Sequence, residues 1–132
     1  MTLPKGWARR VKLDHVGIAV TSVKAAIELF EDKLGGRCLS QTVLESQKII
    51  STKMELRQAH FELMEPTSPE SVVGKFIDKK GEGIHHLSLL VPNLEEAAHE
   101  YQEKGMEIGQ IFSGENYRVA FIHSRSVMGI NP

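Results

Sequence analysis

The segment HVGIAV at residues 15–20 recurs 71 positions later as HLSLLV at residues 86–91. Both segments are short runs of β-forming residues, and each leads directly into a helix start. Ser22 can cap the first helix and Asn93 the second, and each helix ends at a glycine. A match in strand, cap and helix end indicates an internal repeat.

The helices of the two repeats carry their apolar residues at equivalent positions. In each helix these residues fall on one face, which predicts a helix packed on a sheet. The two stripes are Val23, Ala26, Ile27 and Phe30 in the first repeat, and Leu94, Ala97, Ala98 and Tyr101 in the second.

Strand-like segments follow both helices, so each repeat is expected to be a β-α-β-β-β unit. In the first repeat, two of these segments form a hairpin that turns near Arg57 and Gln58. The expected strands are 37–44, 48–56 and 59–64 in the first repeat, and 107–112 and 118–123 in the second.

A short helix is expected between the repeats. Ser68 followed by Pro69 is typical of a capping residue and the first helical position. Four apolar residues are expected to face inward from this helix: Val72, Val73, Phe76 and Ile77.

One face of each repeated strand carries a histidine. Because side chains alternate along a strand, His15 shares a face with Gly17 and Ala19. Small residues leave space, which suits the floor of a ligand cavity. On the hairpin strand, the same alternation places Phe61 and Leu63 against the helix and leaves His60, Glu62 and Met64 toward the cavity.

These positions predict a divalent-metal site made of His15, Glu62 and His86, because imidazole and carboxylate groups from three strands meet at one cavity. Taken singly, each histidine is more often a hydrogen-bonded structural residue, and Glu62 a solvated carboxylate. The repeat favours the joint interpretation, because it places the two histidines at equivalent points. The repeat equivalent of Glu62 is position 133, directly after Pro132, so we expect the last strand to be incomplete here.

Composition narrows the classes of partner. The 132 residues suffice for one domain, and 16 basic against 17 acidic residues give a net charge of −1. That balance argues against a nucleic acid or a membrane surface held by charge. The one cysteine, Cys38, cannot form an internal disulfide, and no apolar run reaches the ~18 residues of a membrane span. We therefore expect a cytoplasmic protein with neither kind of partner.

Several stretches resemble the methylmalonyl-CoA epimerase family of the vicinal oxygen chelate superfamily, to which glyoxalase I also belongs. The most specific is KFIDKKGEGIHH at residues 75–86. The other stretches are 12–20, FELMEP at 61–66 followed by Ser68 and Pro69, and VAFIH at 119–123.

The resemblance implies an α+β fold in which two paired βαβββ modules form a cup-shaped, half-open mixed sheet with helices outside. We expect one domain over residues 1–132, with module one at about 11–66, a linker helix at about 69–80 and module two at about 83–132. It also implies a homodimer and an acyl-CoA substrate.

The activity implied is metal-dependent interconversion of the 2R and 2S forms of methylmalonyl-CoA through an enolate. By position, the ligands of a Co, Zn, Mn or Ni ion are His15, Glu62 and His86, with a fourth glutamate expected at 133. Glu45 is the candidate for a second acid or base. The remaining implied contacts, to the CoA phosphates, fall on Lys79, Lys80 and Arg125.

Two other interpretations stay open. A non-catalytic member of the superfamily would use the same cup to bind a ligand, and the fourth ligand's position beyond Pro132 favours this. Another metal enzyme, such as a glyoxalase-like lyase or a dioxygenase, could use the same two histidines and carboxylate.

Overall fold

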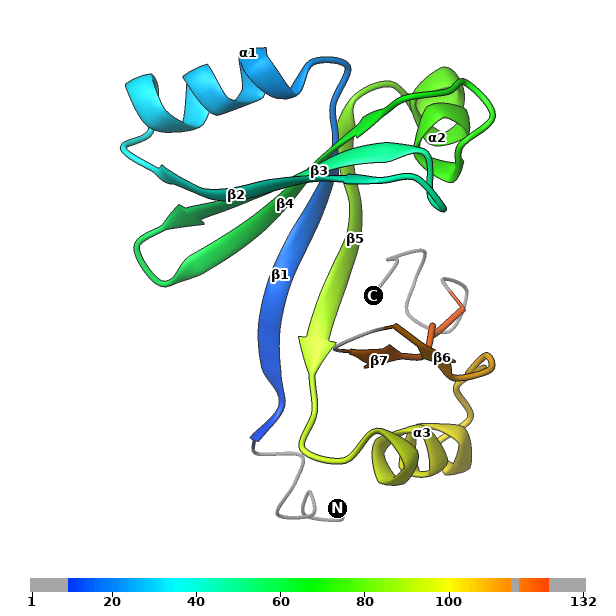
Figure 1. Ribbon diagram of the computed structural model, residues 1–132. Helices are drawn as coiled ribbons and strands as arrows, with labels where there is room; N and C mark the ends of the chain where they lie inside the picture. Colours follow the sequence, from blue (N-terminus) through cyan, green and yellow to red (C-terminus); the bar gives the residue numbers. More distant parts are fainter. Residues whose placement is uncertain (1–9, 115–116, 124–132) are drawn as a thin grey trace. The chain divides into compact units, whose positions relative to one another are not determined.

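The computed structural model describes residues 10–114 and 117–123 (Figure 1). Along these residues, strands and helices alternate as an α+β protein. The elements are β1 (Lys12–Ala19), α1 (Val23–Glu28), a π-helical segment η2 (Leu29–Lys33), β2 (Arg37–Leu44), β3 (Ile49–Leu56), β4 (Ala59–Pro66), α2 (Val72–Lys80), β5 (Gly83–Leu90), α3 (Leu94–Glu103), β6 (Phe112–Ser113) and β7 (Arg118–Val119).

Five strands form a mixed sheet in the order β2-β3-β4-β1-β5. β1 pairs in parallel with β4, while β2, β3 and β4 pair antiparallel through two hairpins. The second hairpin turns at Arg57 and Gln58, as predicted, and Arg57 has a φ of 53° there. The α+β fold with a mixed sheet, which the family resemblance implied, is therefore confirmed.

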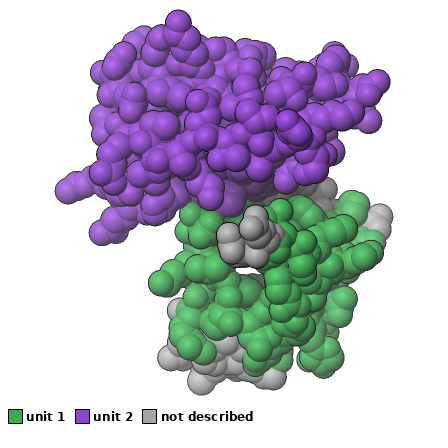
Figure 2. All heavy atoms as spheres, viewed as in Figure 1, with its two compact units in different colours: residues 1–14, 87–132 green, residues 15–86 purple. Residues whose placement is uncertain are grey.

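The chain divides into two compact units (Figure 2). One comprises residues 15–86, and the other comprises 1–14 together with 87–132. The three predicted metal ligands all belong to the unit of residues 15–86.

One core of this unit lies between the sheet and α1. Ser22 caps α1 as predicted, by accepting a hydrogen bond from the backbone N–H of Ala25. Phe61 packs edge-on against Phe30, with ring centres 5.3 Å apart, and Leu63 is fully buried beside them. The prediction that Phe61 and Leu63 face the helix is confirmed.

A second core lies under α2, on the opposite face of the sheet. Here Ala19, Ile49 and Met64 pack against Val73. Met64 is on the predicted face, but α2 covers it and leaves it only 3% exposed. The cavity expected along this face is thus closed at the end where α2 packs.

The start of α2 differs from the prediction. Ser68 and Pro69 form a turn, in which the Ser71 hydroxyl donates to the Ser68 carbonyl oxygen, and the helix begins only at Val72. Ser71 is the cap, since its hydroxyl accepts from the N–H of Gly74. Val72 is the first residue of the helix and is 71% exposed, so the prediction that it faces inward is wrong, whereas Val73 is buried.

The unit containing α3 has less regular strand structure than predicted. Asn93 caps α3 as expected, accepting from the N–H of Glu96. The strands predicted at 107–112 and 118–123 appear as the two-residue strands β6 and β7 and an isolated bridge from Ile108 to Ile122. Gly109 lies within the first of these segments, and a glycine inside a strand weakens it. Among the described residues, no helix is long and apolar enough to cross a bilayer.

Candidate metal centre

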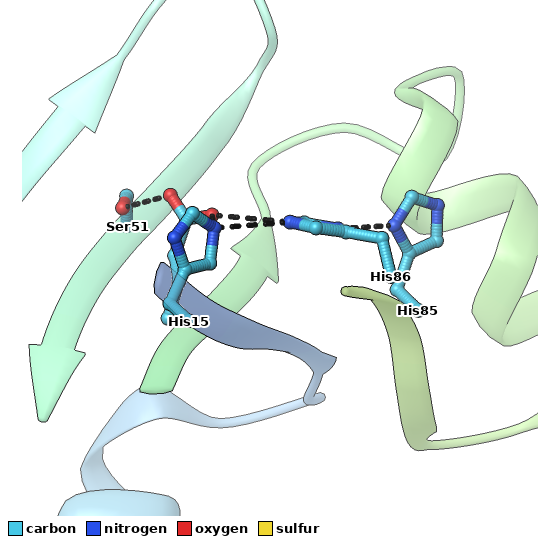
Figure 3. Close-up of polar contacts among 5 residues, drawn as sticks. His15, Ser51, His85 and His86 are labelled. Carbon is cyan, nitrogen blue, oxygen red and sulfur yellow. Dashed lines mark hydrogen bonds and ion pairs between the residues drawn. The ribbon is translucent and has the colours of Figure 1, made fainter. Parts of the chain in front are cut away.

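Three potential ligand atoms converge on one face of the sheet. The Nε2 atoms of His15 on β1 and His86 on β5 lie 3.3 Å apart (Figure 3). Oε1 of Glu62, on β4, is 3.6 Å from the first nitrogen and 3.7 Å from the second. The sequence prediction that these three residues meet is borne out by these distances.

The convergence suits a cation. Imidazole nitrogens and a carboxylate oxygen are preferred ligands of divalent transition metals. The three atoms lie within 4.8 Å of one another, close enough to bind one ion together. The three side chains are 18–25% exposed, so the site is partly sheltered yet open to a small molecule.

Gly17 makes room for His86. A Cβ atom at position 17 would lie 2.2 Å from Cε1 of the His86 ring, closer than any real contact. The space expected beside the small residues of β1 is therefore filled by the imidazole of the other repeat. The His86 ring can therefore occupy its present position only because residue 17 has no side chain.

Ser51 orients the carboxylate. From β3, its hydroxyl donates a 2.6 Å hydrogen bond to Oε2 of Glu62, and the residue is only 5% exposed. The other oxygen, Oε1, is the one directed at the two histidines. Sequence analysis missed Ser51, although strand alternation along the hairpin could have placed it on the face of Glu62.

His85 lies beside His86 despite being its neighbour on a strand. Their Nδ1 atoms are 2.9 Å apart, and the His85 ring also packs edge-on against Phe76 of α2, at 4.9 Å between ring centres. Sequence alternation alone would have placed the two side chains on opposite faces of the sheet. The pairing of the two rings was therefore not predicted.

The surroundings of His86 favour the neutral form of its imidazole. Burial, followed by the neighbouring His85, lowers the pKa of His86 from 6.5 to about 4, while Glu62 opposes the change. Burial also lowers the pKa of His85. Both rings are thus neutral near pH 7, and a neutral imidazole is the form that coordinates metal.

The other predicted site residues are not joined to these ligands. Glu45 lies exposed in the turn between β2 and β3. Lys79 and Lys80 are exposed at the end of α2, where Lys80 lies 5.8 Å from the ring centre of Phe76. Both lysines line an open groove of about 830 Å³ that His85 also borders. Arg125 lies outside the described residues.

The fold is thus a mixed sheet with flanking helices, and one face of it brings two histidines and a glutamate together as a candidate metal site. Residues 14–121 of the chain match the sequence model of the family described as "Glyoxalase/Bleomycin resistance protein/Dioxygenase superfamily". The chain belongs to this superfamily.

Two similar proteins are described as uncharacterized or hypothetical. The chain is 34% identical over 122 residues to the uncharacterized protein YqjC of Bacillus subtilis, covering 90% of this chain and 87% of that one. The crystal structure of hypothetical protein BH1468 from Bacillus halodurans is 39% identical, with a TM-score of 0.86, over 92% of this chain and 90% of that one.

Similarity extends at lower identity to methylmalonyl-CoA epimerases. The Mycobacterium tuberculosis epimerase is 32% identical with a TM-score of 0.81, over 90% of this chain and 83% of that one. Epimerase structures at 25–26% identity hold acyl-CoA ligands, namely methylmalonyl-CoA or 2-nitronate-propionyl-CoA.

Proposed function

We propose that the protein is a metal-dependent epimerase that interconverts the 2R and 2S forms of methylmalonyl-CoA. The observation that carries this proposal is the convergence of His15, Glu62 and His86 on one sheet face. The similarity to epimerases whose structures hold acyl-CoA ligands supports the choice of substrate.

The reaction removes one proton from a carbon that lies between a thioester and a carboxylate, and returns one to the opposite face. A divalent ion such as Co, Zn, Mn or Ni, when bound, would supply Lewis-acid stabilisation of the charge that develops on the thioester oxygen. His15, Glu62 and His86 are the residues that would hold this ion. Their partial burial limits competing water, which strengthens electrostatic interactions at the site.

Other roles complete the proposal. Glu45 is the candidate for one of the two groups that move the proton, and a group in this role must come within hydrogen-bond reach of the substrate carbon. Lys79 and Lys80, on the groove beside α2, are candidates for contacts with the CoA phosphates, together with Arg125. We further propose that the protein acts as a homodimer.

Proton exchange tests this function. The metal-loaded protein is incubated with methylmalonyl-CoA in deuterated buffer, and loss of the α-proton signal is followed by NMR. We expect exchange that a chelator abolishes and that His86→Ala removes. The matched control is His60→Ala, because His60 is on the same strand as Glu62 but contacts Glu55 instead. Absence of exchange with the metal-loaded wild-type protein would overturn the epimerase proposal.

A second function is favoured by the same ligand set. Two histidines and one carboxylate with open coordination positions also form the iron site of non-haem oxygenases. Oxygen uptake by the Fe²⁺-loaded protein with a catechol would support this alternative. Metal-dependent proton exchange that proceeds equally well without oxygen would exclude a role for oxygen in the observed activity.

A further inference from the structure

We propose that Ser51 and His85 are positioning residues of the metal centre, each of which holds one ligand so that a single atom of it faces the common site. The proposal rests on the metal-binding function proposed above and assigns a role to two residues outside the ligand set. Neither residue is directed at the ligand atoms themselves. Each binds the far side of a ligand.

Ser51 determines how Glu62 can bind. A free carboxylate can present either or both oxygens to a cation. Here Oε2 accepts the hydroxyl of Ser51 at 2.6 Å, whereas Oε1 lies 3.6–3.7 Å from the two histidine nitrogens. Because Ser51 is 5% exposed, water cannot readily replace its hydroxyl. Glu62 is therefore held to present one oxygen.

His85 determines which nitrogen of His86 carries the proton. A neutral imidazole has one N–H and one lone pair, and only the lone pair can bind a metal. The Nδ1 atoms of the two rings are 2.9 Å apart, so one of them donates to the other. If Nδ1 of His86 donates to Nδ1 of His85, the lone pair of His86 is left on Nε2. That nitrogen is the one 3.3 Å from His15 (Figure 3).

The His85 ring is itself held in place. It packs edge-on against Phe76 of α2, with ring centres 4.9 Å apart. The helix thus supports His85, and His85 supports His86. Partners of this kind raise metal affinity because they fix the orientation and the tautomer of a ligand, and their loss costs about 10–100-fold in affinity.

Two pairs of variants test the proposal. Ser51→Ala removes the hydroxyl, and Ser40→Ala is its matched control, since Ser40 is exposed on the neighbouring strand β2. His85→Leu removes the acceptor, while His85→Asn places an amide oxygen near the position of Nδ1. The dissociation constant for Co²⁺ and the visible absorption of bound Co²⁺ are measured for each. Nitrogen-15 NMR of the metal-free protein reports the tautomer of His86.

We expect Ser51→Ala and His85→Leu to weaken Co²⁺ binding by about 10–100-fold and to change the absorption spectrum. Ser40→Ala and His85→Asn should bind as the wild type does. In His85→Leu, the His86 proton should no longer be confined to Nδ1. Wild-type affinity and spectrum in both Ser51→Ala and His85→Leu would overturn this proposal alone. Failure of the wild-type protein to bind Co²⁺ would overturn the proposed metal function as well.

Discussion

In a Gly17→Ala variant, the added methyl group would stand where the ring of His86 now lies. The new Cβ would be 2.2 Å from Cε1, whereas ordinary contacts begin near 3.4 Å, so the ring must move by more than about 1 Å. Metal sites tolerate deviations of only about 0.2 Å in ligand distance. Displacing the ring should therefore remove His86 from the ligand set.

The backbone itself should accept the alanine, because Gly17 is within β1 and is not among the positive-φ glycines of the described chain. We expect overpacking to lower the free energy of unfolding of the metal-free protein by about 1–3 kcal/mol. Zn²⁺ affinity should fall by about 100-fold or more, beyond the loss expected for removing a supporting hydrogen bond.

Competition with a chromophoric chelator measures the Zn²⁺ dissociation constant, and urea unfolding measures stability. Gly109→Ala is the matched control, because a Cβ there would meet only one atom, at the ordinary distance of 3.6 Å. If Gly17→Ala bound Zn²⁺ as tightly as the wild type, then the absence of a side chain at Gly17 would not be what admits the His86 ring to the metal centre.

Three further predictions concern stability. The pKa of His86 is about 4 in the folded protein and 6.5 in the unfolded chain, so only the unfolded chain takes up this proton between these two pH values. The free energy of unfolding of the metal-free protein should therefore decrease by up to about 3 kcal/mol as the pH is lowered from 6.5 to 4. Urea titrations should show a shallower fall for His86→Asn, and an identical fall would contradict the assignment. Leu63→Ala should cost about 2–5 kcal/mol of unfolding free energy, because Leu63 is fully buried under α1; a loss below about 1 kcal/mol would refute this role. Asn93→Ala should lower the free energy of unfolding by about 0.5–2 kcal/mol, and Asn93→Ser should retain most of that stability. An unchanged free energy of unfolding in Asn93→Ala would show that the capping bond from Glu96 contributes nothing.

Much of the fold was accessible from local patterns. Strand alternation and helical spacing depend on neighbouring residues, and these patterns correctly placed Phe61 and Leu63 against α1. The caps at Ser22 and Asn93 were predictable for the same reason, since a cap and its partner are three residues apart. The internal repeat then brought His15 and His86 to one site, although they are 71 positions apart in the chain.

What the sequence did not reveal depends on register and on side-chain conformation. Ser51 reaches Glu62 only because of how β3 is aligned against β4, and the His85 ring turns toward His86 through its own torsion angles. The start of α2 was misjudged because the turn at Ser68 competes with the helix for the same backbone groups. The shortness of β6 was not predicted either, because the effect of a glycine such as Gly109 on a strand depends on the neighbouring strand.

We propose that His15, Glu62 and His86 bind one divalent metal ion. The most direct test is a crystal structure of the protein grown with Zn²⁺, with anomalous diffraction recorded on both sides of the zinc absorption edge. We expect one strong anomalous peak about 2.0–2.2 Å from Nε2 of both histidines and from one oxygen of Glu62. Anomalous peaks only at other residues, with these three side chains bound to no metal, would contradict it.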